Sequence, residues 1–200
     1  MRYLYACALC ATAGWATMVH AEDGFCAITS ISGEGASVLR QGRILAAVQA
    51  MPLSDGDQVA TSAGVRMVIS CADETRMTVG PDTTVDLGDM TPREQGWAAF
   101  LLEGIAAFAR PVFGGARFEV RTPSAVASVR STEWIVEVEA GATAVFVDSG
   151  SVSVAAREGG AVLDRGEGID VTIGGTAGPV KTWGAARVQR SKNRLGLIGG

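Results

Sequence analysis

Most of the chain alternates apolar and polar residues with a period of two, the pattern of β-strands that bury one face. Residues 65–69 and 76–79 are two such runs. In residues 133–139, Trp134 and Val136 fall on one face of the predicted strand together with Val138. The other face carries Glu133, Ile135, Glu137 and Glu139. The pattern therefore predicts strands that are half buried.

Turn residues separate these runs at intervals of about 8 to 12 residues, which is typical of β-sandwiches and barrels. Asp148-Ser149-Gly150 lies between two apolar runs and predicts a hairpin turn. Similar glycine-containing turns are predicted at 54–57, 158–160, 164–166 and 174–175. We therefore predict an all-β protein of stacked hairpins, either a sandwich, a barrel or a short solenoid. No linker is apparent, so we expect a single domain around one core.

One segment fits two structures. Trp97, Phe100, Leu101, Ile105 and Phe108 form a helical stripe, although Gly96 and Gly104 interrupt it and Pro111 ends it. The same residues fit two strands that turn near Gly104. The pattern alone does not decide between a helix and strands for residues 97–109.

The N-terminal residues have the features of a secretory signal peptide. Arg2 supplies a positive charge, residues 4–19 are apolar, and Val19-His20-Ala21 offers the small residues that signal peptidase reads. The apolar run is short for a membrane span, which needs about 20 residues. An uncleaved membrane anchor is the alternative. We expect cleavage after Ala21, so that residues 1–21 are a signal peptide and the processed chain is periplasmic, with secretion from the cell as the other destination.

Cleavage would remove the chemistry that most enzymes use. His20 is the only histidine of the chain, and no lysine follows it before Lys181. Without histidine, Ser-His-Asp triads, Cys-His pairs and histidine-based zinc sites are excluded. A hydrolase with paired carboxylates is the common mechanism that stays open. We therefore expect that the protein is not an enzyme and that it has no cofactor and no metal site. The alternative is a carbohydrate-active hydrolase that uses paired carboxylates.

Two cysteines remain after cleavage, Cys26 and Cys71. An exported chain meets an oxidising compartment, where an even number of cysteines predicts a disulfide. Two separate buried thiols are the alternative. A metal site built from two cysteines and no histidine would be under-coordinated.

Charge is distributed unevenly along the chain. Residues 22–170 hold all 21 acidic residues and eleven arginines, a net charge of −10, whereas the last twenty residues carry five cations and no acid. We interpret residues 179–200 as a basic tail that is solvated and poorly ordered. The alternatives are that it folds back on the acidic body or binds an anionic envelope polymer. Trp183, in this tail, is a candidate for an exposed contact, and residues 182–189 could form one or two helical turns.

Residues 117–134, RFEVRTPSAVASVRSTEW, resemble the signature of the FecR-like domain, an all-β module of bacterial envelope proteins. Further segments are similar to landmarks of that family in the same order, and they extend the resemblance over residues 27–173. These segments are 53–61, 79–87, 102–104, 145–154 and 163–171. The resemblance implies an all-β domain, which we place at 22–178, and an extended conformation for 97–109.

The chain departs from this family in two ways. Ser128 and Ser131 stand where the family often has glycine. The namesake regulators relay iron-uptake signals through a cytoplasmic segment and a membrane helix, whereas this chain has an expected signal peptide in their place. We therefore do not expect it to signal across the membrane by itself.

Arg121, Arg130 and Glu133 cluster in the signature and, with Trp183, are candidates for a patch that contacts a partner. A structural ion pair beside Pro123 is the other interpretation. The leading hypothesis is a non-enzymatic periplasmic module that binds or scaffolds another envelope component, in sensing or regulation. The partner would be an envelope protein or an anionic envelope polymer. Nucleic acid is not expected. A secreted structural protein is a further alternative.

Overall fold

The computed structural model describes residues 25–88, 96–111, 117–129 and 131–197. The expected signal peptide, residues 1–21, lies outside the described residues, and so does Arg130. None of the helices in the described part of the chain is long and apolar enough to span a membrane.

The described residues form sixteen strands and one helix. The first eight strands are β1 (Cys26–Ser32), β2 (Ala36–Arg40), β3 (Arg43–Ala46), β4 (Pro52–Leu53), β5 (Gln58–Thr61), β6 (Arg66–Cys71), β7 (Arg76–Val79) and β8 (Thr83–Asp86). The others are β9 (Trp97–Arg110), β10 (Phe118–Arg121), β11 (Ala125–Val129), β12 (Thr132–Glu139), β13 (Ala142–Ala156), β14 (Gly160–Asp164), β15 (Glu167–Val171) and β16 (Lys181–Thr182). The helix is α1 (Ala185–Leu195). The prediction of an all-β protein is confirmed.

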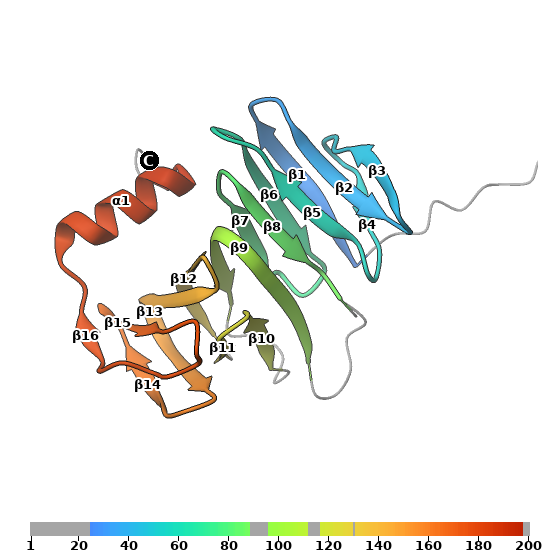
Figure 1. Ribbon diagram of the computed structural model, residues 1–200. Helices are drawn as coiled ribbons and strands as arrows, with labels where there is room; N and C mark the ends of the chain where they lie inside the picture. Colours follow the sequence, from blue (N-terminus) through green and yellow to red (C-terminus); the bar gives the residue numbers. More distant parts are fainter. Residues whose placement is uncertain (1–24, 89–95, 112–116, 130, 198–200) are drawn as a thin grey trace, which may run out of the picture.

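The strands make two sheets that pack face to face as a sandwich (Figure 1). Sheet A has the order β4-β1-β6-β7-β9-β12-β13-β15-β16. Sheet B has the order β3-β2-β5-β8-β9-β10-β11-β13-β14. Neighbouring strands are antiparallel except β9 and β10, which are parallel. The long strands β9 and β13 belong to both sheets and hold the two layers together.

Glycine marks the point where each long strand passes from one sheet to the other. β9 pairs with β8 and β10 before Gly104, and with β7 and β12 after it. Gly104 has a φ of 98°, and a Cβ there would lie 2.3 Å from the Thr83 hydroxyl oxygen. Only glycine fits such a conformation and such a close approach. Residues 97–109 are therefore one bent strand, as the family resemblance implied, and neither a helix nor two strands joined by a turn.

A second glycine crossing lies at residues 148–150, where the sequence-based prediction is wrong. The sequence predicts a hairpin turn there, but β13 continues through them and passes from sheet A to sheet B. Gly150 has a φ of 80°, and a Cβ there would lie 2.6 Å from the carbonyl oxygen of Ser131. Residues that are typical of turns, glycine above all, are therefore also found where a continuous strand bends.

The core between the sheets follows the predicted alternation. Trp134, Val136 and Val138 of β12 all point into it and are at most 2% exposed. Trp134 stacks on Phe108 with 5.2 Å between ring centroids, and Trp97 lies 4.4 Å from Phe118. Full burial of one such side chain contributes about 1.5–3 kcal/mol. The two tryptophans therefore fill the core.

The predicted disulfide is confirmed. Cys26 of β1 and Cys71 of β6 are paired in register and joined by a bond of 2.03 Å. Closing a loop across 45 residues removes entropy from the unfolded chain worth about 4 kcal/mol in the chain-entropy model.

The C-terminal residues are ordered, which corrects the expectation of a solvated tail. After β15 the chain adds β16 to the edge of sheet A and then forms α1, which lies against the outer face of that sheet (Figure 1). The helix runs from Ala185 to Leu195 rather than within residues 182–189. The alternative, that the basic tail folds back on the acidic body, is confirmed.

Candidate interaction surfaces

The structure does not bring the predicted patch together. Arg121 lies on the outer face of sheet B, where its guanidinium contacts Glu119 at 3.0 Å and lies 5.5 Å from the centre of the Phe100 ring. Glu133 lies on the outer face of sheet A, on the opposite side of the sandwich. Arg130 lies outside the described residues. Among the described residues of this region, Arg121 pairs with Glu119.

Trp183 is not the exposed contact that its place in the basic tail suggested. It is 6% exposed and stacks on Phe146 with 5.0 Å between ring centroids. Gly168 leaves room for the indole, since a Cβ there would lie 2.1 Å from Trp183 Nε1. The Arg187 guanidinium lies over the ring, 3.5 Å from its centre. Trp183 is therefore part of the packing that holds the C-terminal segment on sheet A.

The outer face of sheet A carries a second apolar cluster beneath α1, which we call the helix seat. It consists of Ile105 and Ala107 of β9, Ile135 of β12 and Phe146 of β13. Their inward-pointing neighbours are also buried, so these stretches of strand are apolar on both faces. Consecutive apolar residues are typical of strands covered on both sides. That signal was present in the sequence at Trp134-Ile135-Val136.

One face of α1 covers the helix seat. Leu195 and Ser191 are 2% exposed, and Val188 is partly buried against the same cluster. These positions are spaced i, i+3 and i+7, so they share one side of the helix. The chain turns sharply at Gly196, whose φ is 70° and whose N–H donates to the carbonyl oxygen of Asn193.

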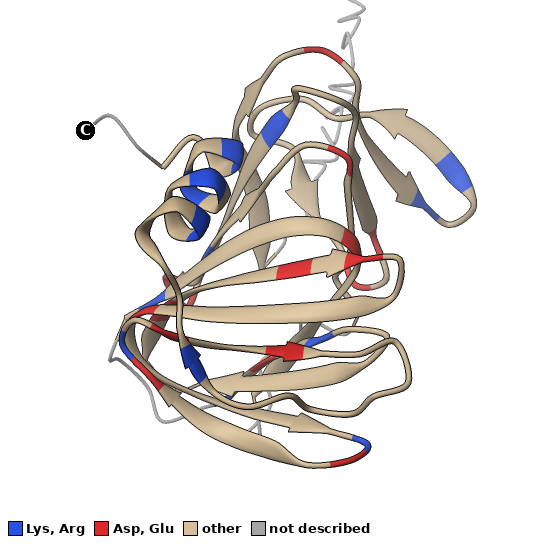
Figure 2. Ribbon diagram, turned by 60° about the vertical axis from the view of Figure 1, so that its left-hand side comes forward, with Lys and Arg blue, Asp and Glu red and all other residues tan. Residues whose placement is uncertain are grey.

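Three polar contacts flank the helix seat. Arg187 pairs with Asp170 of β15 at 2.7 Å, and Lys192 pairs with Asp148 of β13 at 2.7 Å. Between them, the Ser191 hydroxyl donates to Glu137 at 2.6 Å. Two cations of α1 thus pair with carboxylates of sheet A. Figure 2 marks the basic residues of the chain in blue and its acidic residues in red. Because the ion pairs are partly exposed, each contributes about 0.2–1 kcal/mol.

A groove of about 580 Å³ lies between α1 and the adjoining strand ends. Arg190 and Arg194 line its helical side, and Glu103, Glu137 and Glu139 line its sheet side. Glu133, the third acid of that strand face, instead lines a smaller cavity of about 290 Å³ that lies under the C-terminal end of α1. The glutamates of this strand face therefore do not line a single cavity together.

The outer face of sheet B differs from that of sheet A. No helix of the described residues covers it. Phe100, Leu102 and Val162 are 36%, 39% and 64% exposed there. Small and polar side chains from the neighbouring strands surround them, among them Ser128, Ser153 and Ala155. We call this surface the open face.

Acidic residues in two loops make turn contacts. The Asp86 carboxylate accepts a hydrogen bond from the N–H of Gly88 at 2.8 Å, and Glu167 accepts one from the N–H of Asp164 at 2.8 Å. Among the described residues no group of three or more potential ligands could hold a metal ion.

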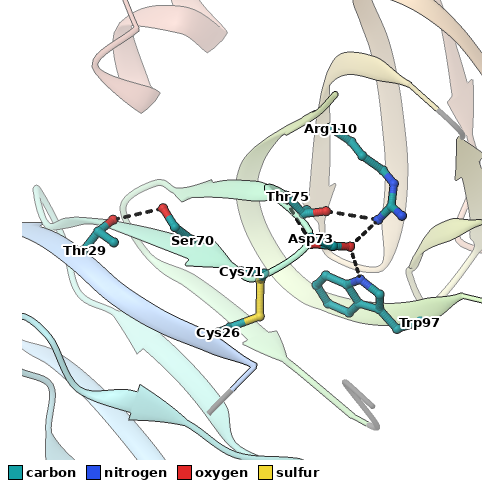
Figure 3. The surroundings of a disulfide bond; sticks show 8 residues. All are labelled: Cys26, Thr29, Ser70, Cys71, Asp73, Thr75, Trp97 and Arg110. Atoms are coloured by element: carbon teal, nitrogen blue, oxygen red, sulfur yellow. Dashed lines mark hydrogen bonds and ion pairs between the residues drawn. A yellow bond between two sulfur atoms is a disulfide. The ribbon is translucent and has the colours of Figure 1, made fainter. Parts of the chain in front are cut away.

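A polar cluster that the sequence did not point to lies beside the disulfide (Figure 3). The Asp73 carboxylate accepts hydrogen bonds from Arg110 Nη1 at 2.7 Å and from Trp97 Nε1 at 2.9 Å. Arg110 also donates to the Thr75 hydroxyl at 3.0 Å. Burial acts to raise the pKa of Asp73, but the hydrogen bonds of Trp97 and Thr75 and the charge of Arg110 lower it below its usual value.

This cluster joins the two ends of β9. Trp97 stands at the beginning of the strand, in sheet B, and Arg110 at its end, in sheet A. Asp73 therefore ties together the two layers at one end of the sandwich. We interpret it as a structural element, because its hydrogen bonds are made within the protein.

Comparison with known proteins agrees with the fold. The family model described as FecR protein matches residues 57–153. No curated protein matches the chain. Two crystal structures from Parabacteroides distasonis ATCC 8503, each described as "a putative anti-sigma factor", share the fold with a TM-score of 0.56 and 24% sequence identity. The match covers 66% of this chain and 62% of theirs.

The family match and the sandwich thus confirm the resemblance carried by residues 117–134. Over residues 57–153 this chain is similar to the FecR family.

Proposed function

We propose that this protein is a non-enzymatic binding module of the bacterial envelope, which contacts another envelope component in sensing or regulation. The match of residues 57–153 to the FecR family carries the proposal. Members of that family are regulatory proteins rather than enzymes, and each of the two structures of similar fold is described as "a putative anti-sigma factor". A regulator of this kind acts through contacts with other proteins.

The distribution of polar groups supports this function. Three acids on the outer face of sheet A, at 137, 148 and 170, are bonded to residues of α1. Asp73, whose pKa is lowered, bonds to side chains of the protein itself. The open face, by contrast, presents Phe100 and Leu102 to solvent. Apolar side chains grouped on an exposed surface are typical of protein contact sites.

A protein is the partner that we propose, in preference to an anionic polymer. The two cations of α1 at 187 and 192 are neutralised by carboxylates of sheet A, which reduces the positive charge available to a polymer. We place this contact in the periplasm, on the basis of the export signal expected at residues 1–21.

Site-specific photo-crosslinking in intact cells tests the proposal. A photoreactive phenylalanine analogue is introduced at Leu102 or Val162 of the open face, at Gln189 of α1, or at Ile173, a 74% exposed control outside both surfaces. We expect a discrete crosslinked protein from the first or second surface and none from Ile173. Absence of a specific adduct at every site would contradict a binding function. A cytosolic product with residues 1–21 intact would contradict the location.

A further inference from the structure

The helix seat and α1 together define the chemistry of a ligand. The seat is apolar, with Asp148 on one flank and Asp170 on the other. We infer that the outer face of sheet A is a docking surface for a basic amphipathic helix of a protein partner, and that α1 occupies this surface in the free chain. The inference rests on the proposed binding function and specifies the partner and the surface that receives it.

The contacts of α1 give the pattern that a partner helix needs. Two apolar residues at the positions of Val188 and Leu195 fill the helix seat, and a small hydroxyl residue at the position of Ser191 reaches Glu137. A cation one residue before the first apolar position meets Asp170, as Arg187 does. A second cation five residues later meets Asp148, as Lys192 does.

α1 by itself is a weak helix. It has 11 residues, whereas isolated helices shorter than about 12–15 residues are marginal in water. Its N-cap is Gly184, which makes no side-chain capping bond, and its first turn contains no acidic residue. A cation in the first turn, Arg187, is placed unfavourably relative to the helix dipole. The helix therefore depends on its contacts with the sheet, and a partner helix can compete for them.

The chain also provides a pivot. Gly184 joins Trp183 to α1 in an extended conformation, and a Cβ there would meet no atom within 4 Å. The helix can swing away about this residue while Trp183 stays packed on Phe146. The carbonyl oxygens at the other end of α1 receive Arg66, whose Nε donates to Arg194 at 2.7 Å. This contact is exposed, so water can replace it when the helix moves.

A titration with the helix as a free peptide tests the inference. The probe is a labelled synthetic peptide of residues 184–197. It is added to the full chain and to a full-chain variant in which Ser191→Pro and Leu195→Asp release α1, since proline interrupts a helix and the aspartate is incompatible with the helix seat. We expect saturable binding to the released variant. Binding to the unmodified chain should be at least about tenfold weaker, because the tethered helix competes at an effective concentration of order millimolar.

Matched controls locate the peptide on the helix seat. A peptide with Leu195→Asp should not bind, and Asp148→Ala together with Asp170→Ala in the released variant should weaken binding several-fold. If the released variant fails to fold, a milder variant with Arg187→Ala and Lys192→Ala loosens α1 and should show the same order of affinities.

Three results would overturn the inference. They are no binding by a released variant that still unfolds cooperatively, equal affinity for the released and unmodified chains, and a concentration-dependent dimer formed by exchange of α1 between copies. The last result would make a second copy the occupant. A negative titration would leave the crosslinking test of the open face unaffected, so failure of this inference and failure of the proposed function are distinguishable.

Discussion

The two outer faces of the sandwich are built from the same kind of strand but meet different surroundings. On sheet A, Ile135 and Phe146 point outward and are covered by Trp183 and α1, and α1 brings cations to Asp148 and Asp170. On sheet B, Phe100 and Leu102 point outward and are partly exposed. The difference shows that, among the described residues, the C-terminal segment covers one outer face and leaves the other uncovered.

The largest expected loss of stability comes from a substitution at Gly104, where β9 passes from one sheet to the other. We expect Gly104→Ala to lower the free energy of unfolding by more than about 3 kcal/mol, because the new Cβ would collide with Thr83 and with the carbonyl oxygen of Asp82, 2.6 Å away, in addition to the strain of a positive φ. Urea unfolding measures the loss. The matched control is Gly42→Ala, whose φ of 76° is similar but whose Cβ would meet nothing within 4 Å. If Gly104→Ala lowered the free energy of unfolding no more than Gly42→Ala does, the close packing that we describe where β9 passes between the sheets would be contradicted.

The next effect distinguishes the two faces directly. We expect Leu195→Ala to destabilise α1 by about 2–3 kcal/mol, since it leaves a cavity over the helix seat. Hydrogen exchange of the amides of residues 185–195 should accelerate accordingly. On the open face, Leu102→Ala removes a side chain that is 39% exposed, and we expect a change within about 0.5 kcal/mol. Equal effects of the two leucine substitutions would remove the distinction between the faces.

The Asp73 cluster predicts a dependence of stability on pH. The pKa of Asp73 is lowered in the folded chain, so its stabilisation is complete above the unfolded value, near 3.9, and is lost as pH falls through the folded value. Asp73→Asn should destabilise the protein at neutral pH by about 1–2 kcal/mol. Below the folded pKa, unfolding of the variant and the unmodified chain should converge. A pH-independent difference between them would contradict this account.

The smallest effect concerns the ion pairs of α1. Lys192→Ala should lower the stability of the docked helix by about 0.2–1 kcal/mol, and less in high salt. Arg190→Ala, on the same helix, removes a cation that has no ion pair among those found in the described residues, and should change the stability of the docked helix less. Hydrogen exchange at low and high salt compares the two variants. If Arg190→Ala destabilised the docked helix more than Lys192→Ala, the charges that hold α1 on the sheet would be those of the groove and not the ion pairs beside the helix seat.

Local patterns in the sequence were sufficient for the all-β class and for the core side of β12. Trp134 and Val136 point inward because alternation in a strand is a geometric property of the backbone. The pairing of Cys26 with Cys71 also followed from cysteine count and expected compartment. The predicted patch was less successful, because Arg121 and Glu133 are close in sequence but lie on strands of different sheets.

The glycines show why local patterns have a limit. Asp148-Ser149-Gly150 has the residues of a hairpin turn, yet β13 continues through it. Before Gly150 the strand pairs with β12 in sheet A, and after it the strand pairs with β11 in sheet B. Nothing local to residues 148–150 distinguishes a reversal of the chain from a crossing between layers. The pattern around Gly104 likewise did not decide the structure of residues 97–109, and their extended conformation was predicted from the family resemblance.

The sequence by itself determined that the chain is a β protein with one disulfide and a FecR-like signature, because strand alternation, turn residues and cysteine number are local properties. Only the tertiary structure decided that the basic C-terminal segment is a docked helix, that Trp183 is buried and that one outer face is covered. Those outcomes depend on residues such as Gly168, Phe146 and Asp148 meeting segments far along the chain. An amphipathic segment of 11 residues is too short to specify its own fold, so the surface that it meets makes it a helix.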